Sequence, residues 1–474
     1  MARSHTVFER QAPHPAAVTS SLATARDSCF WNDDAPLGDP RPALRSDRHT
    51  ELAVVGGGFT GLWTAVRAKQ RDPHRTVTLI EGGRLGWSAS SRNGGFCAAS
   101  LTHGEENGRS RWPEELARLD RLGRDNLAGI AATFADHGLD TEFEQTGSLS
   151  VAVEPHQVEW LRAAAAADEG TFLDEAAVRA EVASPTYLAG LTADGDALLH
   201  PAKAVRALAG LAESLGVEIV ERTPVRSVET GRTGPVRLQT SGGTLTADRV
   251  ALATNVFPAL LRRYRRHTVP VYDYVVVTEP LTAQQRDAIG WHSRRGIDDL
   301  ANQFHYYRLT GDGRILFGGY DAVHHRGGRV APSYEHRPET YRRLTAHLLT
   351  TFPQLEGIRI AHRWAGPIDT CTRFCAFFGL ARAGRVAHAA GFTGLGVGAS
   401  RFAGDVMLDL LDGLDTERTR LRMVREAPLP FPPEPLASIG IELTRRSLDR
   451  ADHAEGRRDL WLRTLDRAGL GFDS

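Results

Sequence analysis

Three glycines and one acidic residue near the start of the chain have the types and spacing of a phosphate- and ribose-binding element. Gly56, Gly58 and Gly61 follow directly on the apolar run Leu52–Val55. Gly56 permits a sharp turn, Gly58 lets the backbone approach a pyrophosphate, and Gly61 permits close packing of a helix on a strand. Glu81 ends the next apolar run, 20 residues past Gly61, where a carboxylate accepts hydrogen bonds from an adenosine ribose. This spacing predicts a dinucleotide site.

The same stretch supplies the elements that must position these residues. A buried strand is expected to end at Val55, and a helix to begin near Thr60. The free peptide N–H groups and the dipole of that helix would hold an anion. A second strand is expected over residues 76–80. A glycine-rich turn without a ligand is the alternative interpretation, and the complete strand–turn–helix context argues against it.

Residues 82–97 are rich in glycine and small polar residues, which disfavours the interior of a helix or strand. Their hydroxyls, amide, cation and backbone N–H groups suit the phosphates, ribityl chain and ring edge of a cofactor. An ordinary surface loop is the alternative. The candidate residues are Ser90, Ser91, Arg92, Asn93, Gly94 and Gly95.

A second strand–turn–helix pattern lies near the end of the chain. A short apolar strand over residues 385–390 leads into the glycine-rich segment 391–398, and an apolar helix then runs through Leu411. Between the two patterns, Tyr272–Thr278 and Gln303–Leu309 favour strands, and residues 310–313 predict a hairpin turn after the second of them.

Composition sets limits on the kind of protein. The chain has 474 residues, is 41% hydrophobic and 24% charged, and carries a net charge of −1, which gives no reason to expect nucleic acid or an anionic membrane as a partner. The four cysteines are too dispersed for a disulfide framework, and no metal-binding pattern accompanies them. No apolar segment is long enough to span a bilayer, and the N-terminus lacks the apolar core of a signal peptide. We therefore predict a cytoplasmic protein with no metal, no nucleic acid and no membrane partner.

The two ends of the chain differ from its middle. Residues 1–25 are polar and are expected to be poorly ordered, and Phe30–Trp31 forms a small apolar island before a proline-rich linker. After residue 416, a proline cluster and two amphipathic helices are expected to pack on the body of the protein.

Four stretches together resemble one family. In this order and spacing they are similar to the FAD-dependent amine and amino-acid oxidases of the D-amino-acid oxidase superfamily, most closely the gamma-glutamylputrescine oxidase-like branch. The resemblance covers roughly residues 28–415. The stretches are AVVGGGFTGLWTA, IEGGRLGWSASSRNGGF, LHPAKAVRALAGLAESLGVEIVERTPV and GFTGLGVGASRFAGDVMLDLL.

The resemblance implies an α/β fold with a discontinuous FAD-binding Rossmann-like domain and a substrate domain with a large, mainly antiparallel sheet. The FAD-binding domain would comprise residues 49–110, 196–262 and 360–415, and the substrate domain residues 111–195 and 263–359. Residues 1–48 would form an N-terminal arm and linker, and residues 416–474 a C-terminal helical tail.

The resemblance also assigns cofactor-binding positions. The first glycine turn, with Thr60, would face the pyrophosphate of FAD, and Glu81 its ribose. The loop would follow the ribityl chain and ring, Val225 would place its backbone against the adenine, and Thr254 would close the site. Near the far edge of the flavin would lie Gly394, Leu395, Gly396 and Val397.

Two departures from the family pattern bear on the substrate and on flavin reactivity. Many relatives have a histidine where this chain has Leu395, and many carry T-x-D where this chain has residues 371–373. In sarcosine oxidases a cysteine attaches FAD covalently, but neither Cys97 nor Cys371 lies in that motif, so we expect non-covalent FAD.

Amine oxidation by a flavin needs a neutral substrate nitrogen, an aligned Cα–H bond and a dry pocket, and the protein supplies the alignment. Strand alternation places Tyr306 and Arg308 on one face, and we expect both to point into the pocket, with Arg308 gripping a carboxylate or phosphonate. An arginine that pairs with an internal acid or faces solvent is an equal alternative. Asp273 and Tyr274, on the preceding strand, are further candidates.

The expected function is oxidation of an amine or amino acid to an imine by hydride transfer to flavin N5. Water would then hydrolyse the imine to a carbonyl compound, and O2 would accept the electrons and give H2O2. Oligomerisation is left open. Two alternatives also stay open, a flavin monooxygenase and a non-catalytic flavoprotein subunit that uses the C-terminal tail as an interface.

Overall fold

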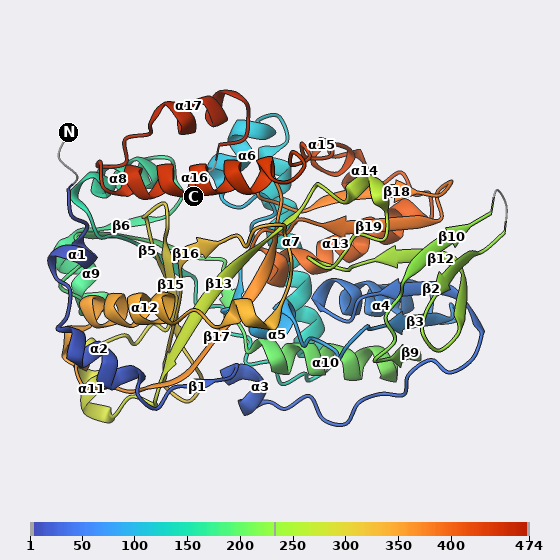
Figure 1. Cartoon of the computed structure of the whole chain (residues 1–474), viewed down its shortest axis with the longest axis horizontal. Helices are drawn as coiled ribbons and strands as arrows, with labels where there is room; N and C mark the ends of the chain where they lie inside the picture. Colours follow the sequence, from blue (N-terminus) through green and yellow to red (C-terminus); the bar gives the residue numbers. More distant parts are fainter. Residues whose placement is uncertain (1–3, 232–233, 472–474) are drawn as a thin grey trace.

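The computed structural model describes residues 4–231 and 234–471, arranged as two domains side by side along the long axis of the molecule (Figure 1). Each domain is built around one large sheet. An eight-stranded sheet organises the domain on the right of Figure 1, and a nine-stranded sheet organises the domain on the left.

The eight-stranded sheet has a parallel core in the order β19, β12, β2, β3, β9, and β10, β11 and β18 join it by antiparallel pairing. The sequence analysis predicted three of its strands, β2, β3 and β19, from their apolar runs. Its strands are β2 (Arg48–Val55), β3 (Val77–Ile80), β9 (Val217–Val220), β10 (Ser227–Thr230), β11 (Val236–Gln239), β12 (Thr244–Leu252), β18 (Phe377–Ala381) and β19 (Val386–Ala390).

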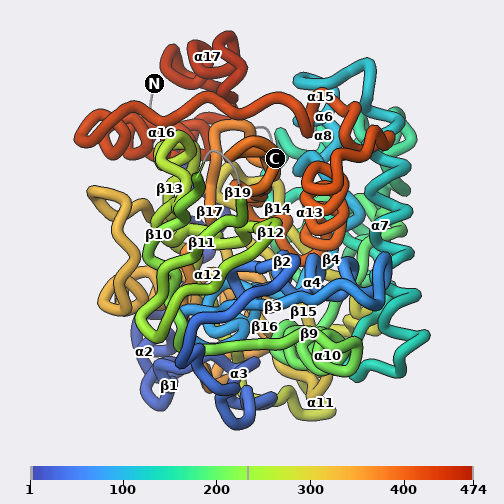
Figure 2. The backbone as a smooth tube through the Cα atoms, turned by 90° about the vertical axis from the view of Figure 1, so that its right-hand side faces the viewer, coloured from blue at the N-terminus to red at the C-terminus, as the bar shows by residue number. Residues whose placement is uncertain are grey.

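Helices cover one face of this sheet. Figure 2 shows α13 and α4 against the strands, with α10 below them and α7 beyond. Apolar side chains from all four helices share one core with β2 and β3. The helices of this domain are α4 (Phe59–Arg71), α5 (Ala89–Arg92), α6 (Glu105–Arg111), α7 (Leu116–Asp136), α10 (Pro201–Ser214) and α13 (Gly396–Leu411).

The nine-stranded sheet is mainly antiparallel, as expected, with parallel pairing only between β1 and β17 and between β14 and β5 among the described residues. Its order is β1-β17-β13-β16-β15-β14-β5-β7-β6. These strands are β1 (Arg26–Asp27), β5 (Ser148–Ala152), β6 (Thr171–Leu173), β7 (Ala189–Ala193), β13 (Val269–Thr278), β14 (Gly296–Asp299), β15 (His305–Leu309), β16 (Ile315–Val323) and β17 (Ile360–Thr370).

The two faces of this sheet have different surroundings. The outer face packs under α12 (Pro338–Thr351) and carries Tyr274, Tyr307 and Phe317. The inner face carries Trp364 and Tyr306 and lies against the loop of residues 82–97. Smaller elements of the domain are α8 (Pro155–Ala166), α9 (Glu175–Glu181) and α11 (Ala283–Ile289), and β4 (Phe96–Cys97) pairs with β8 (Ala197–Leu198) beside the loop.

Three expectations need correction. Strand β17 pairs with β13, so residues 360–370 belong to the substrate sheet rather than to the FAD-binding domain. Helix α7 packs on α13, so this part of residues 111–195 belongs to the other domain. Residues 4–25 of the segment 1–25 fold onto the body, because α1 (Val7–Arg10) and α2 (Pro15–Leu22) bury Val7, Phe8 and Val18 against the outer face, and residues 1–3 lie outside the described residues.

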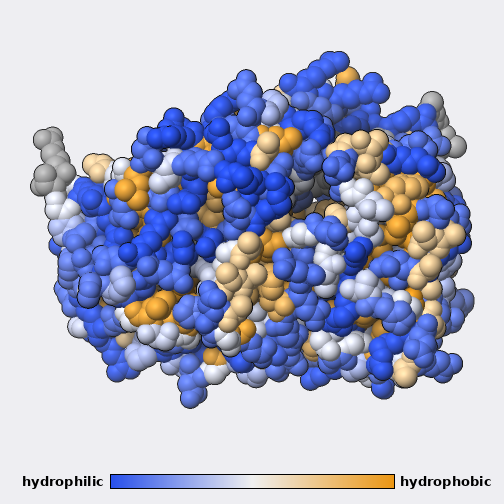
Figure 3. Space-filling model, turned by 180° about the vertical axis from the view of Figure 1, so that it is seen from behind, coloured by the Kyte–Doolittle hydropathy of each residue, from blue (hydrophilic) through white to orange (hydrophobic). Residues whose placement is uncertain are grey.

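The C-terminal tail packs on the body, as predicted. Its helices are α14 (Glu417–Arg420), α15 (Arg422–Arg425), α16 (Leu436–Asp452) and α17 (Leu460–Arg467), and the last two cross the top of Figure 1. Asp452 accepts hydrogen bonds from Asn302 and Gln303 of the substrate domain. The face in Figure 3 is mainly hydrophilic, with hydrophobic residues in small groups. Within the described residues, no helix has the length and apolar character needed to cross a membrane.

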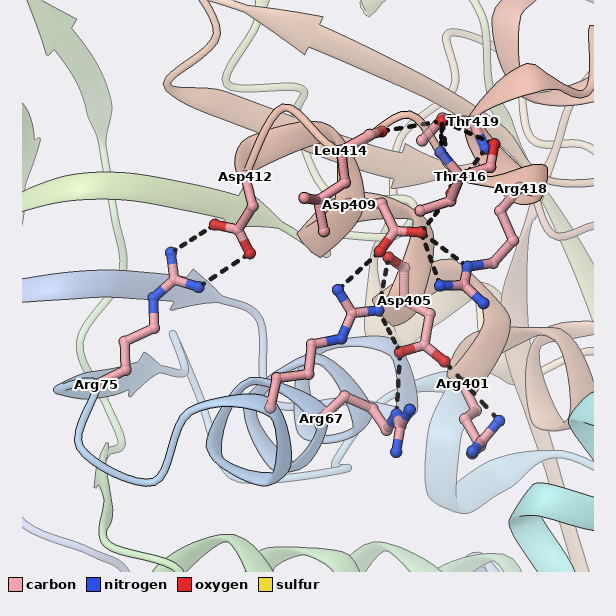
Figure 4. Close-up of polar contacts among 11 residues, drawn as sticks. Arg67, Arg75, Arg401, Asp405, Asp409, Asp412, Leu414, Thr416, Arg418 and Thr419 are labelled. Atoms are coloured by element: carbon pink, nitrogen blue, oxygen red, sulfur yellow. Dashed lines mark hydrogen bonds and ion pairs between the residues drawn. The ribbon is translucent and has the colours of Figure 1, made fainter.

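An ion network joins α4 to α13 (Figure 4). Asp409 is 1% exposed and accepts hydrogen bonds from Arg71 at 2.8 Å and from Arg418 at 2.9 Å. Asp405 accepts from Arg67 at 3.0 Å and from Arg71 at 2.7 Å. Burial raises the pKa of Asp405, but the charges of Arg67 and Arg71 outweigh burial and leave that pKa below its usual value. The network fixes how the two helices sit on each other.

We expect Asp409→Ala to lower the free energy of unfolding by about 2–3 kcal/mol, because two arginines lose a buried partner but stay accessible enough to regain some water. Asp412→Ala is the matched control, since Asp412 pairs with Arg75 at 3.2 Å nearer the surface and should cost less than about 1 kcal/mol. Urea denaturation of the FAD-loaded protein measures both values. Equal losses in the two variants would contradict the prediction.

Candidate cofactor and substrate site

The turn between β2 and α4 accepts only glycine at two positions. Gly56 has a φ of +114°, and a β-carbon there would overlap the Ala253 carbonyl group at the end of β12. A β-carbon at Gly61 would overlap the Gly56 carbonyl oxygen. At Gly58 a β-carbon would come within 2.6 Å of the Ser90 hydroxyl oxygen. Strand, helix and loop therefore meet here without room for side chains.

Helix α4 begins with unpaired donors. Its N-cap is Gly58, no side chain caps it, and its first turn has no acidic residue. The N–H groups of Gly58, Thr60 and Gly61 have no acceptor among the residues that the structure describes. Helix α13 begins in the same way, with Leu395 as its N-cap and no side-chain cap. Because β2 and β19 both pair in parallel with β12, the two helix N-termini lie at the same edge of the sheet, where they could hold an anion.

Glu81 follows β3 directly and lies beside the glycine turn. Its carboxylate accepts hydrogen bonds from the N–H groups of Gly57 (2.7 Å) and Gly83 (2.6 Å) and from the indole of Trp87 (3.0 Å). Burial raises the pKa of Glu81 despite these donors. A carboxylate offers about four acceptor positions, so one remains for a ribose hydroxyl.

The loop of residues 82–97 is more structured than its composition indicated, since it contains α5 and β4. Ser91 is buried and its hydroxyl donates to the Gly86 carbonyl, so this side chain shapes the loop. The Ser90 hydroxyl instead accepts the N–H of Phe59 at 2.9 Å and lies against the glycine turn. Asn93 donates to the Ala89 and Ser90 carbonyls and accepts the N–H of Gly95.

The other predicted cofactor residues surround the same edge of the sheet. The Thr223 N–H donates to the Glu81 carbonyl, which places half-buried Val225 nearby. Thr254 follows Ala253 at the end of β12. The late glycine turn is held by Asp369 of β17, which is 2% exposed and accepts the N–H of Gly391 at 2.6 Å. Burial raises the pKa of Asp369 to about 7.

Asp369 was not among the residues predicted from the sequence, because β17 also contains His362 and Arg363 and so gives no clear signal for one buried acid. Val397 is buried in the core of the FAD-binding domain, so only its backbone is available to a cofactor. Gly394 and Gly396 are more accessible.

On the inner face of the nine-stranded sheet, Tyr306 and Asp273 form a pair. The Tyr306 hydroxyl donates to Asp273, and the N–H of Gly319 donates to the other carboxylate oxygen at 3.2 Å. Both side chains are half-buried. Burial raises the pKa of Asp273 to about 6, against the effect of these donors. A β-carbon at Gly94 would come within 2.6 Å of the Tyr306 ring, so the pair borders the loop of residues 82–97.

Opposite Asp273 the ladder between β13 and β16 is irregular, with a register shift between Tyr272 and Tyr274. Gly319, Tyr320 and Asp321 all have positive φ values, of 91°, 35° and 67°. Such irregularities re-aim side chains and gather at functional sites.

A second carboxyl group, Asp298 of β14, lies directly across from Tyr306 in the register. It shares its face with Gly296, where a β-carbon would overlap the ring of Phe96. Burial raises the pKa of Asp298 to about 7, although the Ser150 hydroxyl donates to it at 3.2 Å. Asp298 was not a candidate from the sequence, because nothing in its local pattern assigns it to the inner face.

Two predicted substrate residues need revision. Tyr274 lies on the outer face, is fully buried and donates to the Tyr334 carbonyl at 2.6 Å, so it does not border this region. Arg308 shares the inner face with Tyr306, as alternation predicted, but its guanidinium is 1% exposed and donates to the Leu199 carbonyl at 2.7 Å. Burial lowers the pKa of Arg308 to about 10. We therefore no longer expect it to grip a substrate carboxylate.

Arg92, the arginine of the loop, also has a protein partner. Arg92 donates to Glu335 through both terminal nitrogens, one of them at 3.0 Å. Glu335 lies between β16 and α12 in a segment that packs on β13 and β17, and no sequence pattern pairs it with Arg92.

The sequence family described as FAD dependent oxidoreductase matches residues 51–410. The chain belongs to this family. Among its relatives, gamma-glutamylputrescine oxidoreductase of Escherichia coli is 28% identical over 414 residues, which cover 83% of this chain and 91% of the relative. A probable oxidoreductase OrdL of Haemophilus influenzae is 25% identical over 390 residues, which cover 80% of this chain and 86% of the relative. The expected resemblance is thus confirmed.

Solved structures confirm the fold. Glycine oxidase from Geobacillus kaustophilus superposes with a TM-score of 0.64 at 19% identity, covering 78% of this chain and 96% of the oxidase. L-proline dehydrogenase from P. horikoshii gives a TM-score of 0.63 at 19% identity, covering 81% of this chain and 96% of the dehydrogenase.

The protein is therefore an FAD-dependent oxidoreductase, and the site fits this cofactor. The uncapped helix N-termini could hold the pyrophosphate, the glycine turn leaves space for it, and Glu81 has acceptor capacity for the ribose.

We expect the FAD to be bound without a covalent link. Cys97 and Cys371 are both fully buried, and burial raises the pKa of each thiol, which opposes the thiolate that attachment needs. Acid precipitation should release all yellow colour into the supernatant. Colour that stays with the pellet would contradict this, and its loss in Cys371→Ala or Cys97→Ala would then identify the attached residue.

Proposed function

We propose that the protein oxidises an amine that lacks an α-carboxylate, giving an imine that water hydrolyses to a carbonyl compound. The observation that carries this proposal is the charge on the inner face. Asp273 and Asp298 flank Tyr306, while Arg92 is paired with Glu335 and Arg308 is bonded to backbone carbonyls. Such a face suits a cationic ammonium group, and neither Arg92 nor Arg308 has a guanidinium free for a substrate carboxylate.

Asp273 can also deprotonate the substrate. An amine reaches the enzyme mainly as an ammonium ion, which has no lone pair and so resists loss of a hydride. Asp273, with its pKa raised to about 6, can accept one ammonium proton near neutral pH, while Tyr306 keeps its position by donating to that carboxylate. Bound FAD supplies the acceptor for the hydride from the carbon next to the nitrogen. The two electrons pass finally to O2, giving H2O2.

The names of the relatives bear on this proposal. One carries the name gamma-glutamylputrescine oxidoreductase, and another, 30% identical over 297 residues, is a 4-methylaminobutanoate oxidase from Paenarthrobacter nicotinovorans. In 4-methylaminobutanoate the amine stands apart from the carboxylate, which fits the proposal. The name gamma-glutamylputrescine does not say which nitrogen is oxidised, and a glycine oxidase of Bacillus licheniformis, 27% identical over 213 residues, is named for an α-amino acid.

The test is anaerobic bleaching of the flavin by a panel of primary and secondary amines, each matched with the α-amino acid of the same carbon skeleton. Amines should bleach the flavin, and their matched α-amino acids should be slower by at least about 100-fold, since a carboxylate beside two carboxyl groups is repelled. Faster bleaching by the α-amino acids would overturn the proposal. NADPH consumption without an amine would favour a monooxygenase. If no compound bleaches the flavin, the result would favour a non-catalytic subunit.

A further inference from the structure

Three successive carbonyl groups of the loop of residues 82–97 are each bonded by a side chain from outside the loop. Two of these side chains come from the N-terminal arm, at or beside α3 (Phe30–Asp34), and one comes from β17. The bonds run from the Cys29 thiol to the Ser91 carbonyl (3.6 Å), from the Trp364 indole to the Arg92 carbonyl (2.8 Å) and from the Trp31 indole to the Asn93 carbonyl (2.9 Å).

These bonds fix the direction of the following N–H groups. In a trans peptide the N–H points away from the preceding carbonyl. The indole of Trp31 therefore determines where the Gly94 N–H points, and the indole of Trp364 does the same for Asn93. The Gly94 N–H has no acceptor among the residues that the structure describes, although Gly94 is buried. A buried donor without an acceptor is costly, so an acceptor from a bound ligand fits this position.

Trp31 is itself held rigidly. It is 0% exposed, its ring lies edge-on to His200 at 4.6 Å, and the Arg308 guanidinium stacks over it at 5.5 Å. The same guanidinium donates to the Leu199 carbonyl, so Arg308 contacts the Trp31 ring while it is held by a backbone carbonyl just before α10. This arrangement gives the buried arginine a role that does not involve the substrate.

We propose that Trp31 and Trp364 are positioning residues, which orient the two peptides that follow Arg92 so that the Gly94 N–H donates to an acceptor atom of the flavin ring. Trp31 lies outside residues 51–410, so the N-terminal arm completes the cofactor site of the family domain. This inference depends on bound FAD and is independent of the proposed amine substrate.

The test compares Trp31→Phe with the wild type by two readouts that need no substrate, the FAD dissociation constant and the visible absorption bands of the bound flavin. Phenylalanine keeps most of the packing and removes the donor. We expect a roughly five- to tenfold higher dissociation constant, the effect of one hydrogen bond, together with a shift of the bands. The matched control is Trp291→Phe, because the Trp291 indole is also buried and donates to the Arg295 carbonyl at 3.1 Å, within the core of the outer face.

Unchanged flavin bands in Trp31→Phe, or equal changes in both variants, would overturn the proposal, because a merely structural role would affect them alike. If Trp31→Phe does not fold, Trp364→Phe takes its place with the same two readouts. An altered spectrum and weaker FAD binding in that variant support the proposal, and unchanged values refute it.

Discussion

We expect the Gly61→Ala variant to bind FAD about 100-fold more weakly than the wild type. A β-carbon at this position would overlap the Gly56 carbonyl oxygen and lie 3.4 Å from the Val54 side chain. Neither neighbour can move alone, because both belong to the strand and turn that hold the pyrophosphate site. Overpacking of this kind costs about 1–3 kcal/mol, and the upper end of that range corresponds to about 100-fold in affinity.

Gly210→Ala is the matched control. Gly210 lies within α10 of the same domain, and a β-carbon there meets no atom within 4 Å. Alanine should raise the free energy of unfolding there by about 0.5–1 kcal/mol and leave FAD affinity unchanged. Titration of each apoprotein with FAD, followed by flavin fluorescence, measures the difference. Similar affinities for the two variants would show that Gly61 is not needed for close packing.

We expect Asp273→Asn to lower kcat/KM for the best amine about 100- to 1,000-fold at pH 8, since the variant loses both a countercharge for the ammonium group and a proton acceptor. The wild-type kcat/KM should fall tenfold per pH unit below about pH 6, where Asp273 becomes protonated. The variant should lack this acidic limb. Stopped-flow reduction of the flavin across pH 5–9 provides both profiles.

Loss of stability should not account for the effect. Burial raises the pKa of Asp273 from 3.8 to about 6, so the folded state prefers the protonated carboxyl. The stability that this preference contributes is present below pH 3.8 and is lost as the pH rises through 6. At pH 8 the wild type has already lost it, and asparagine removes only the hydrogen bonds of one carboxylate oxygen.

Tyr274→Phe serves as the control for this experiment, because Tyr274 adjoins Asp273 in the chain but lies on the outer face of the sheet. Its kcat/KM should stay within about twofold of the wild type, with the acidic limb intact. An acidic limb that persists in Asp273→Asn would assign the titration to another group, of which Asp298 is the first candidate.

Much of the cofactor site could be predicted from the sequence because its signals are local. Gly56, Gly58, Gly61 and Glu81 lie within one strand–turn–helix–strand unit, so their types and spacing can be read in one short stretch, although Gly56 also packs against Ala253 at the end of β12. The late turn before α13 could be found in the same way. Positions that have no room for a β-carbon must be glycine, so they appear in the sequence as glycines at a fixed spacing.

The substrate face was decided by tertiary structure. Alternation correctly placed Tyr306 and Arg308 on one face, but it could not say what their side chains would meet. Only the folded chain brings Asp273 and Asp298 to Tyr306, and only it ties Arg308 to a carbonyl that lies 109 positions away in the sequence. Asp273 and Tyr274 were equal candidates in the sequence. Their side chains lie on opposite faces of the sheet, and only the packing of the domains shows which face borders the cofactor site.

The sequence by itself thus determined the glycine turn and the strands and helix around it, because these depend mainly on backbone conformation and on the spacing of residues within one short segment. Tertiary structure decided the charge of the substrate face, the boundary of the two domains at β17 and the place of Trp31 beside the loop. Each of these depends on pairing between distant segments, and an amino-acid pattern records which residues are apolar without recording which segment they will meet.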